Sequence, residues 1–150
     1  MQQFKQNILE ACKSNLADKI QVLSLIMHEV TDSANSETKS SAGDKHETAR
    51  AMMQLEQEKL SKQIADLAEQ KKEFDKIDFT KLLVKIGQGS LVETSTGFFL
   101  IASSIGKIVV DDKTVFVISN KSPLAQQMIG LRVGDTVAFN SVDYQIKNSL

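Results

Sequence analysis

The sequence has no tryptophan, one proline, one tyrosine and one cysteine among its 150 residues. The single cysteine, Cys12, excludes an internal disulfide and any zinc site built from several cysteines. No run of about 18 apolar residues is present, so we expect no membrane span. The first residues, MQQFKQNILEACKSNL, lack a continuous apolar core, so we expect no signal peptide and a cytoplasmic protein.

Neither sign of charge is in large excess. The net charge is −1, divided into −3 over residues 1–78 and +2 over residues 79–150. This imbalance is too small to indicate nucleic-acid binding by itself.

Glycine is nearly missing from the first half, where Gly43 is the only one in 86 residues. Apolar residues instead recur every seven positions on both sides of a Ser-, Thr- and Asn-rich stretch, at Leu9, Leu16, Leu23 and Val30, and again at Met53, Leu60, Leu67 and Phe74. Cys12 and Ile26 form a second row, three residues after Leu9 and Leu23, which Lys19 interrupts. Met52 is expected to pack in the seam beside Met53. The pattern predicts an antiparallel coiled-coil hairpin over residues 1–77 with its tip near 31–47.

The pattern changes from residue 79 onward. Short runs rich in β-branched and aromatic residues alternate with glycines: SLVET, GFFLIAS, GKIVV, TVFVIS, DTVAF and DYQIK. We expect these to be strands. A short helix is predicted in SPLAQQMIG, with Ser122 as its cap, Pro123 in its first position and Gly130 past its end. The pattern therefore predicts a second, β-rich domain over residues 79–150.

Two blocks resemble a known family. The segment ISNKSPLAQQMIGLRVGDTVAF (118–139) is similar to a block of the Gre-type transcript cleavage factors of bacterial RNA polymerase. GDKHETA (43–49) resembles the hairpin-tip block of the same family. The matching positions are Ser122, Pro123, Leu124, Gly130, Val133, Gly134 and Asp135 in the first block, and Gly43, Asp44, Glu47 and Ala49 in the second.

The resemblance implies an α+β fold, with an N-terminal coiled-coil hairpin followed by a small FKBP-like twisted β-sheet domain with one short helix. It also implies a transcription elongation factor that binds RNA polymerase through Asn120, Ser122, Pro123 and Leu124. The hairpin would enter the secondary channel, where Asp44 and Glu47 share a Mg²⁺ ion with the polymerase and assist cleavage at a backtracked RNA 3′ end. Such a protein is not an enzyme alone; it binds no cofactor tightly and has no small-molecule substrate.

Other interpretations of the tip stay open. An acid at a helix start followed by Glu three residues later is a variant of the capping box. His46 is either a surface residue or a ligand or proton carrier, and Arg50 contacts either RNA phosphate or a neighbouring acid.

Departures from the family pattern leave two further functions open. Ala125 replaces the usual Gly, and Thr48 and Ala51 replace the family's Asn and aromatic residue. The changes at Thr48 and Ala51 favour a non-cleaving regulator that occupies the same channel. A coiled-coil interaction module unrelated to polymerase is the remaining alternative.

Overall fold

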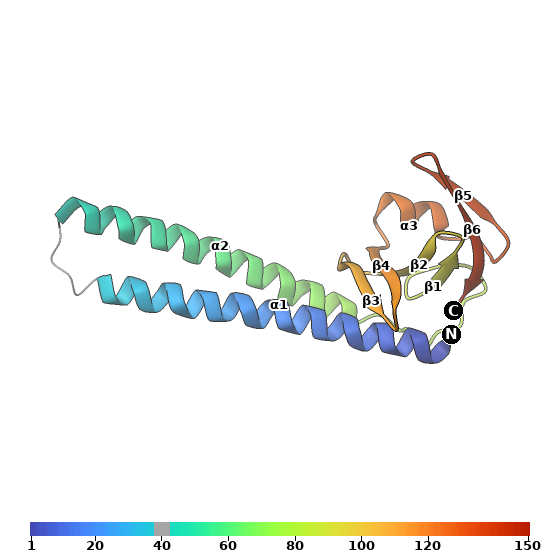
Figure 1. The fold of residues 1–150 in the computed structure, drawn as a ribbon, viewed down its shortest axis with the longest axis horizontal. Coiled ribbons are helices and arrows are strands. Elements are labelled where there is room, and N and C mark those ends of the chain that lie inside the picture. The colour runs from blue at the N-terminus through green and yellow to red at the C-terminus, as the bar shows by residue number, and fades with distance from the viewer. Residues whose placement is uncertain (38–42) are drawn as a thin grey trace. The chain divides into compact units, whose positions relative to one another are not determined.

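The computed structural model describes the backbone of residues 1–37 and 43–150 and the side chains of residues 1–36 and 47–150. Two long helices, α1 (Gln2–Glu37) and α2 (Gly43–Asp75), precede a six-stranded sheet and one short helix (Figure 1). This order confirms the predicted α+β class. The later elements are β1 (Leu91–Thr94), β2 (Gly97–Ala102), β3 (Gly106–Val110), β4 (Lys113–Ser119), α3 (Pro123–Met128), β5 (Thr136–Phe139) and β6 (Val142–Ser149).

The chain divides into two compact units. The hairpin unit comprises residues 16–69, and the sheet unit comprises residues 1–15 and 70–150. The first turns of α1 therefore belong with the sheet, although α1 continues without a break into the hairpin unit. No helix in the described part of the chain is both long and apolar enough to cross a membrane.

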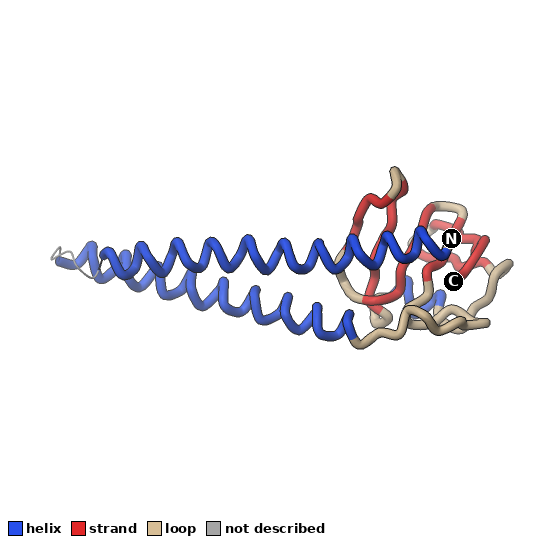
Figure 2. The backbone as a smooth tube through the Cα atoms, turned by 90° about the horizontal axis from the view of Figure 1, so that it is seen from below, coloured by secondary structure: helices blue, strands red, loops and turns tan. Residues whose placement is uncertain are grey.

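The hairpin unit is held together by an apolar seam between α1 and α2, which run side by side (Figure 1 and Figure 2). The predicted heptad positions are buried or half-buried there: Leu16, Leu23, Val30, Met53, Leu60 and Leu67. The second row of α1 differs from the prediction, because Lys19 is exposed and Ile26 is 38% exposed. Half-buried residues lie instead four positions after each heptad residue, at Ile20, Met27 and Ala34. Both steps fit a 3.5-residue repeat, so periodicity alone did not distinguish them.

A polar pair also crosses the seam. The Gln57 Nε2 atom of α2 donates a hydrogen bond of 3.2 Å to the Thr31 Oγ1 atom of α1. Gln57 and Thr31 are both half-buried. A polar contact inside an apolar seam favours one alignment of the helices over shifted ones, because a shift leaves both groups without a partner.

The six strands lie in the order β3-β4-β2-β1-β6-β5. β2 and β4 pair in parallel, and all other neighbours are antiparallel. Each predicted strand is present. Two hairpins turn through residue pairs with positive φ, namely Asp111–Asp112 between β3 and β4, and Asn140–Ser141 between β5 and β6. Asp and Asn tolerate this conformation, so both turns reverse the chain without glycine.

Apolar side chains cover both faces of the sheet. On one face Val92, Phe99, Ile101, Val137 and Ile146 pack with Ala125 and Met128 of α3. The other face carries Leu100, Val115 and Val117, each at most 1% exposed.

The start of α1 packs against this second face. The Phe4 ring lies 5.0 Å from the Phe98 ring, and Asn7 Nδ2 donates a 2.8 Å hydrogen bond to Asp111 Oδ2. Lys113 Nζ lies 4.9 Å from the Phe4 ring centre, in cation–π range. Further along α1, Ile8 and Cys12 are fully buried.

The buried thiol of Cys12 makes stability fall at alkaline pH. Burial raises the pKa of Cys12 from 9.0 to about 12. Above pH 9 the unfolded chain loses this proton while the folded chain keeps it, so unfolding becomes easier by about 1.4 kcal/mol per pH unit until pH approaches 12. We expect Cys12→Ala to remove this fall in urea unfolding measured from pH 8.5 to 11. An equally steep fall in the variant would contradict a buried, neutral thiol.

Lys5 has the opposite effect at pH values below 10.5. Its side chain is 6% exposed, and its Nζ atom donates a 2.9 Å hydrogen bond to the Leu150 carbonyl oxygen. Burial lowers the pKa of Lys5 from 10.5, although the Asp78 carboxylate opposes the shift. The folded chain therefore releases this proton first, and stability rises with pH from the lowered pKa up to 10.5.

We expect Lys5→Met, made in the Cys12→Ala chain, to abolish that rise. Because the Leu150 carbonyl also accepts from Leu91 N, the variant leaves no orphaned acceptor. We expect its stability at pH 7 to be equal or higher by about 1 kcal/mol, as for other buried charges replaced by apolar groups. A loss at pH 7, together with an unchanged pH profile, would show that the ammonium stabilises the fold.

Candidate functional site

The acidic pair of the predicted tip lies at the beginning of α2. This helix starts at Gly43, so positions 44 and 47 are both within its first turns and three residues apart. Residues at this spacing are neighbours on a helix surface. The side chain of Glu47 is exposed. The side chains of Asp44 and His46 lie outside the described residues, so the proposed metal pair and the role of His46 stay predictions.

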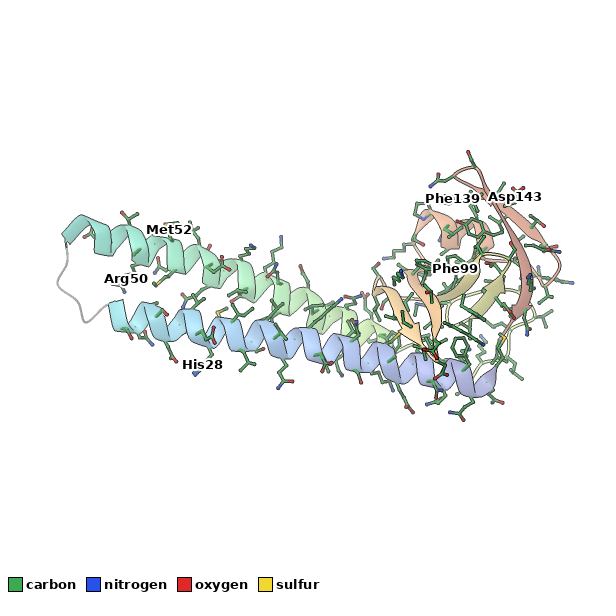
Figure 3. The ribbon with its side chains drawn as sticks, in the orientation of Figure 1. His28, Arg50, Met52, Phe99, Phe139 and Asp143 are labelled. Carbon is green, nitrogen blue, oxygen red and sulfur yellow. The ribbon has the colours of Figure 1, made fainter. Side chains whose placement is uncertain are left out.

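The described side chains around the tip are mostly solvent-facing. Arg50, which was predicted to pair with Asp44 or Glu47, is exposed and makes no ion pair within 4.0 Å with Glu47. The pairing with Asp44 stays a prediction, because the side chain of Asp44 is not described. Met52 is 66% exposed, which corrects its predicted seam packing; Met53 alone is half-buried. His28 lies on α1 (Figure 3), and its Nε2 atom is 3.4 Å from Asp32 Oδ2, with both side chains exposed.

The described side chains contain no group of three or more His, Cys, Asp or Glu residues that could hold a metal ion. Glu47 offers a carboxylate, the kind of ligand that Mg²⁺ prefers. If each carboxylate binds through one oxygen, Asp44 and Glu47 together supply two of the six ligands that Mg²⁺ takes. The donor set therefore fits an ion whose other ligands come from water or a partner.

The predicted docking segment is a tightly hydrogen-bonded turn leading into α3. Ser122 has extended backbone angles (φ −66°, ψ 148°), and its Oγ atom accepts a 3.3 Å hydrogen bond from Ala125 N, which confirms its capping role. Lys121 N donates to Ser119 Oγ at 3.1 Å. Gln126 Nε2 of α3 donates to the Asn120 carbonyl oxygen. The turn is therefore fixed before any partner binds.

These contacts separate the residues that shape the segment from those that face solvent. Ser122 is engaged as the cap, and Leu124 packs against the apolar core beneath α3. Pro123 is exposed and Asn120 is half-buried. Lys121 is exposed beside them and was not among the predicted docking residues, although its charge between two of them was a readable signal.

The second half of the block also has a structural reason for its spacing. Gly130 has φ +89°, a left-handed conformation just after α3 that favours glycine. Further on, Asp135 Oδ2 accepts a 2.8 Å hydrogen bond from Arg132 N, closing the turn that contains Gly134 at φ +98°. The matched positions thus build one continuous cap, helix and turn.

No protein-family model matches this sequence, and no curated protein was found to be similar. Among solved structures, the chain has a distant structural neighbour described as the transcription factor Gfh1. The two are 17% identical, the match covers 89% of this chain and 90% of that one, and the TM-score is 0.39.

Removing the cap of α3 tests whether the predicted docking segment is preorganised. We expect Ser122→Ala to lower the free energy of unfolding by about 1 kcal/mol, because Ala125 N loses its acceptor. Ser122→Asp should keep the parent stability, since Asp caps equally well. Urea unfolding measures both, and equal stability of all three chains would contradict the capping role.

Proposed function

We propose that this chain is a Gre-type transcription elongation factor that binds bacterial RNA polymerase. Its sheet unit would dock on the polymerase, and its hairpin would enter the secondary channel. The observation that carries the proposal is the 118–139 block. Its matched residues have specific local tasks, and together they present Lys121 and Pro123 on a fixed turn. A rigid, exposed turn suits docking because little conformational freedom is lost on binding.

The proposed activity is assistance in cleaving backtracked RNA. Phosphodiester hydrolysis with two metal ions requires stabilisation of both the attacking and the leaving oxygen, which a bound Mg²⁺ supplies. Asp44 and Glu47 would each contribute a carboxylate to hold that ion, and the polymerase would contribute the remaining site. The position of both residues in the first turns of α2, next to the hairpin connection, supports this role. The chain would not catalyse cleavage alone.

A non-cleaving regulator of the same channel is the second candidate. The family's Asn after the second acid is replaced here by Thr48, and its aromatic residue by Ala51, which is exposed. A tip without these two side chains would still occupy the channel, but it would lack two groups that the family places beside its acidic pair. A coiled-coil module without polymerase contact is the third candidate. Co-purification of polymerase subunits with the full chain separates it from the first two.

The decisive measurement is cleavage of a stalled, backtracked elongation complex with Mg²⁺ present. We expect the parent chain to accelerate cleavage. With the Asp44→Ala/Glu47→Ala variant the acceleration should be about 100-fold smaller, because metal-ion stabilisation contributes several kcal/mol. Glu56→Ala is the matched control, since Glu56 is an exposed acid of the same helix. Binding without acceleration by the parent chain would instead identify a non-cleaving regulator.

A further inference from the structure

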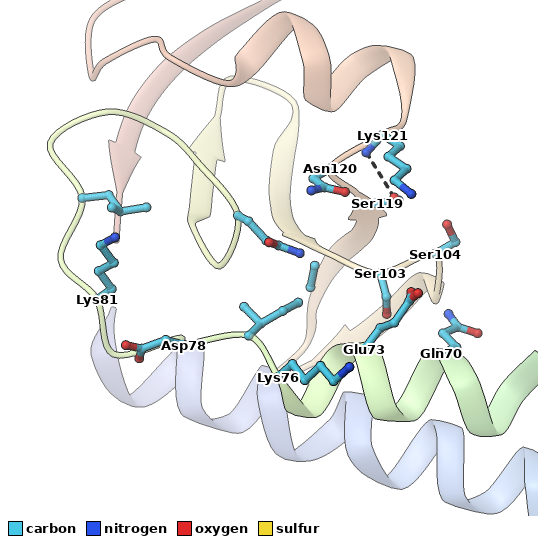
Figure 4. Close-up of a pocket in the computed structure, with 14 residues that line it drawn as sticks. Gln70, Glu73, Lys76, Asp78, Lys81, Ser103, Ser104, Ser119, Asn120 and Lys121 are labelled. Carbon is cyan, nitrogen blue, oxygen red and sulfur yellow. Dashed lines mark hydrogen bonds between the residues drawn. The ribbon is translucent and has the colours of Figure 1, made fainter.

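The sheet unit contains a hollow of about 760 Å³ that the predicted function does not use. One wall is the end of α2 and the segment that follows it, including Gln70, Glu73 and Lys76. The opposite wall is formed by the residues that follow β2 and β4, including Ser103 and Lys121 (Figure 4). All of its lining residues belong to the sheet unit. Its volume lies in the range of small-molecule sites.

Positive charge exceeds negative charge around the hollow. Lys76, Lys81 and Lys121 line it, against the carboxylates of Glu73 and Asp78. None of the three lysines makes an ion pair within 4.0 Å among the described side chains. Lys81 already attracts the Asp78 carboxylate, so a negatively charged ligand would gain most from Lys76 and Lys121.

One of the two carboxylates is already engaged. Asp78 Oδ1 accepts a 2.9 Å hydrogen bond from Thr80 N and a 2.6 Å hydrogen bond from Thr80 Oγ1. These bonds hold the pKa of Asp78 below its usual range, and the bond from the Thr80 hydroxyl has the largest effect. Glu73 is the other carboxylate that lines the hollow, and no such hydrogen bond to a neighbouring residue engages it among the described side chains.

Two buried polar atoms of the lining have no hydrogen-bond partner within the protein. Ser103 is 6% exposed and its Oγ atom is unpaired, and Gln70 Nε2 is likewise buried and unpaired. Both residues line the hollow, one from each wall, and Figure 4 shows both near Glu73. Because buried polar groups are nearly always satisfied, two unpaired donors lining one hollow call for an acceptor from outside the chain.

We propose that this hollow binds a small molecule bearing an oxyanion, either phosphate or carboxylate. Ser103 Oγ and Gln70 Nε2 donate hydrogen bonds to it, and Lys76 and Lys121 supply the opposite charge. The apolar side chains of Ile77 and Leu83, which also line the hollow, contact its carbon skeleton. The inference stands independently of any polymerase function, because it rests on residues of the sheet unit alone.

The test is a titration of the full chain followed by amide NMR shifts, with inorganic phosphate in one arm and succinate in the other. We expect saturable shifts at Ser103 and Lys121 with a Kd in the millimolar range or tighter. Stronger binding in one arm identifies the oxyanion. Lys76→Met should weaken binding about fivefold. Lys72→Met, which changes an exposed lysine in the last turn of α2 that does not line the hollow, should leave binding unchanged.

Ser103→Ala separates binding from folding. Removing an unpaired buried hydroxyl should leave stability equal or higher, while weakening oxyanion binding about fivefold. Non-saturable shifts in both arms, shifts spread over lysines outside the hollow, or a parent-like affinity in the Ser103→Ala and Lys76→Met chains would overturn the proposal. A loss of stability in Ser103→Ala would also overturn it, since the hydroxyl would then have a structural role.

Discussion

The packing of the first turns of α1 against the sheet is the contact on which the rest of the structure depends. A six-stranded sheet with apolar residues on both faces needs two covers, and α3 has only six residues and covers one. Phe4, beside Phe98, begins the second cover, and Asn7 bonds to Asp111 in the turn between β3 and β4. Burying this face contributes about 25 cal/mol for each Å² of apolar surface removed from water. The same helix then continues into the hairpin unit, so the element that completes the sheet also begins the hairpin.

The block around α3 shows why a functional motif and a structural motif are hard to separate. Ser122 caps the helix, Gly130 allows its left-handed exit, and Asp135 closes the next turn. Each would be required by this backbone whether or not a partner bound. Lys121 has an exposed side chain without such a task, so exposure rather than motif membership marks it as a proposed docking residue.

Most of the fold was predictable because its signals are local. Glycines and alternating apolar residues marked the strands, and a seven-residue step marked the hairpin seam. The second row of the seam was not predictable, since Ile26 and Ile20 are equally apolar and only the partner helix selects between them. The buried Lys5 was hidden for a related reason: nothing in its neighbourhood shows that its ammonium meets the Leu150 carbonyl, 145 residues away.

The oxyanion site was beyond sequence reasoning altogether, because Gln70, Ser103 and Lys121 come together only through the sheet topology. The parallel pairing of β2 with β4 is the cause. Parallel strands end at the same edge, so the residues following Ala102 and those following Ser119 become neighbours there. The end of α2 then closes the opposite wall. The two proposed sites thus have opposite chemistry: acids in the hairpin unit suited to a cation, and unpaired donors with lysines in the sheet unit suited to an anion.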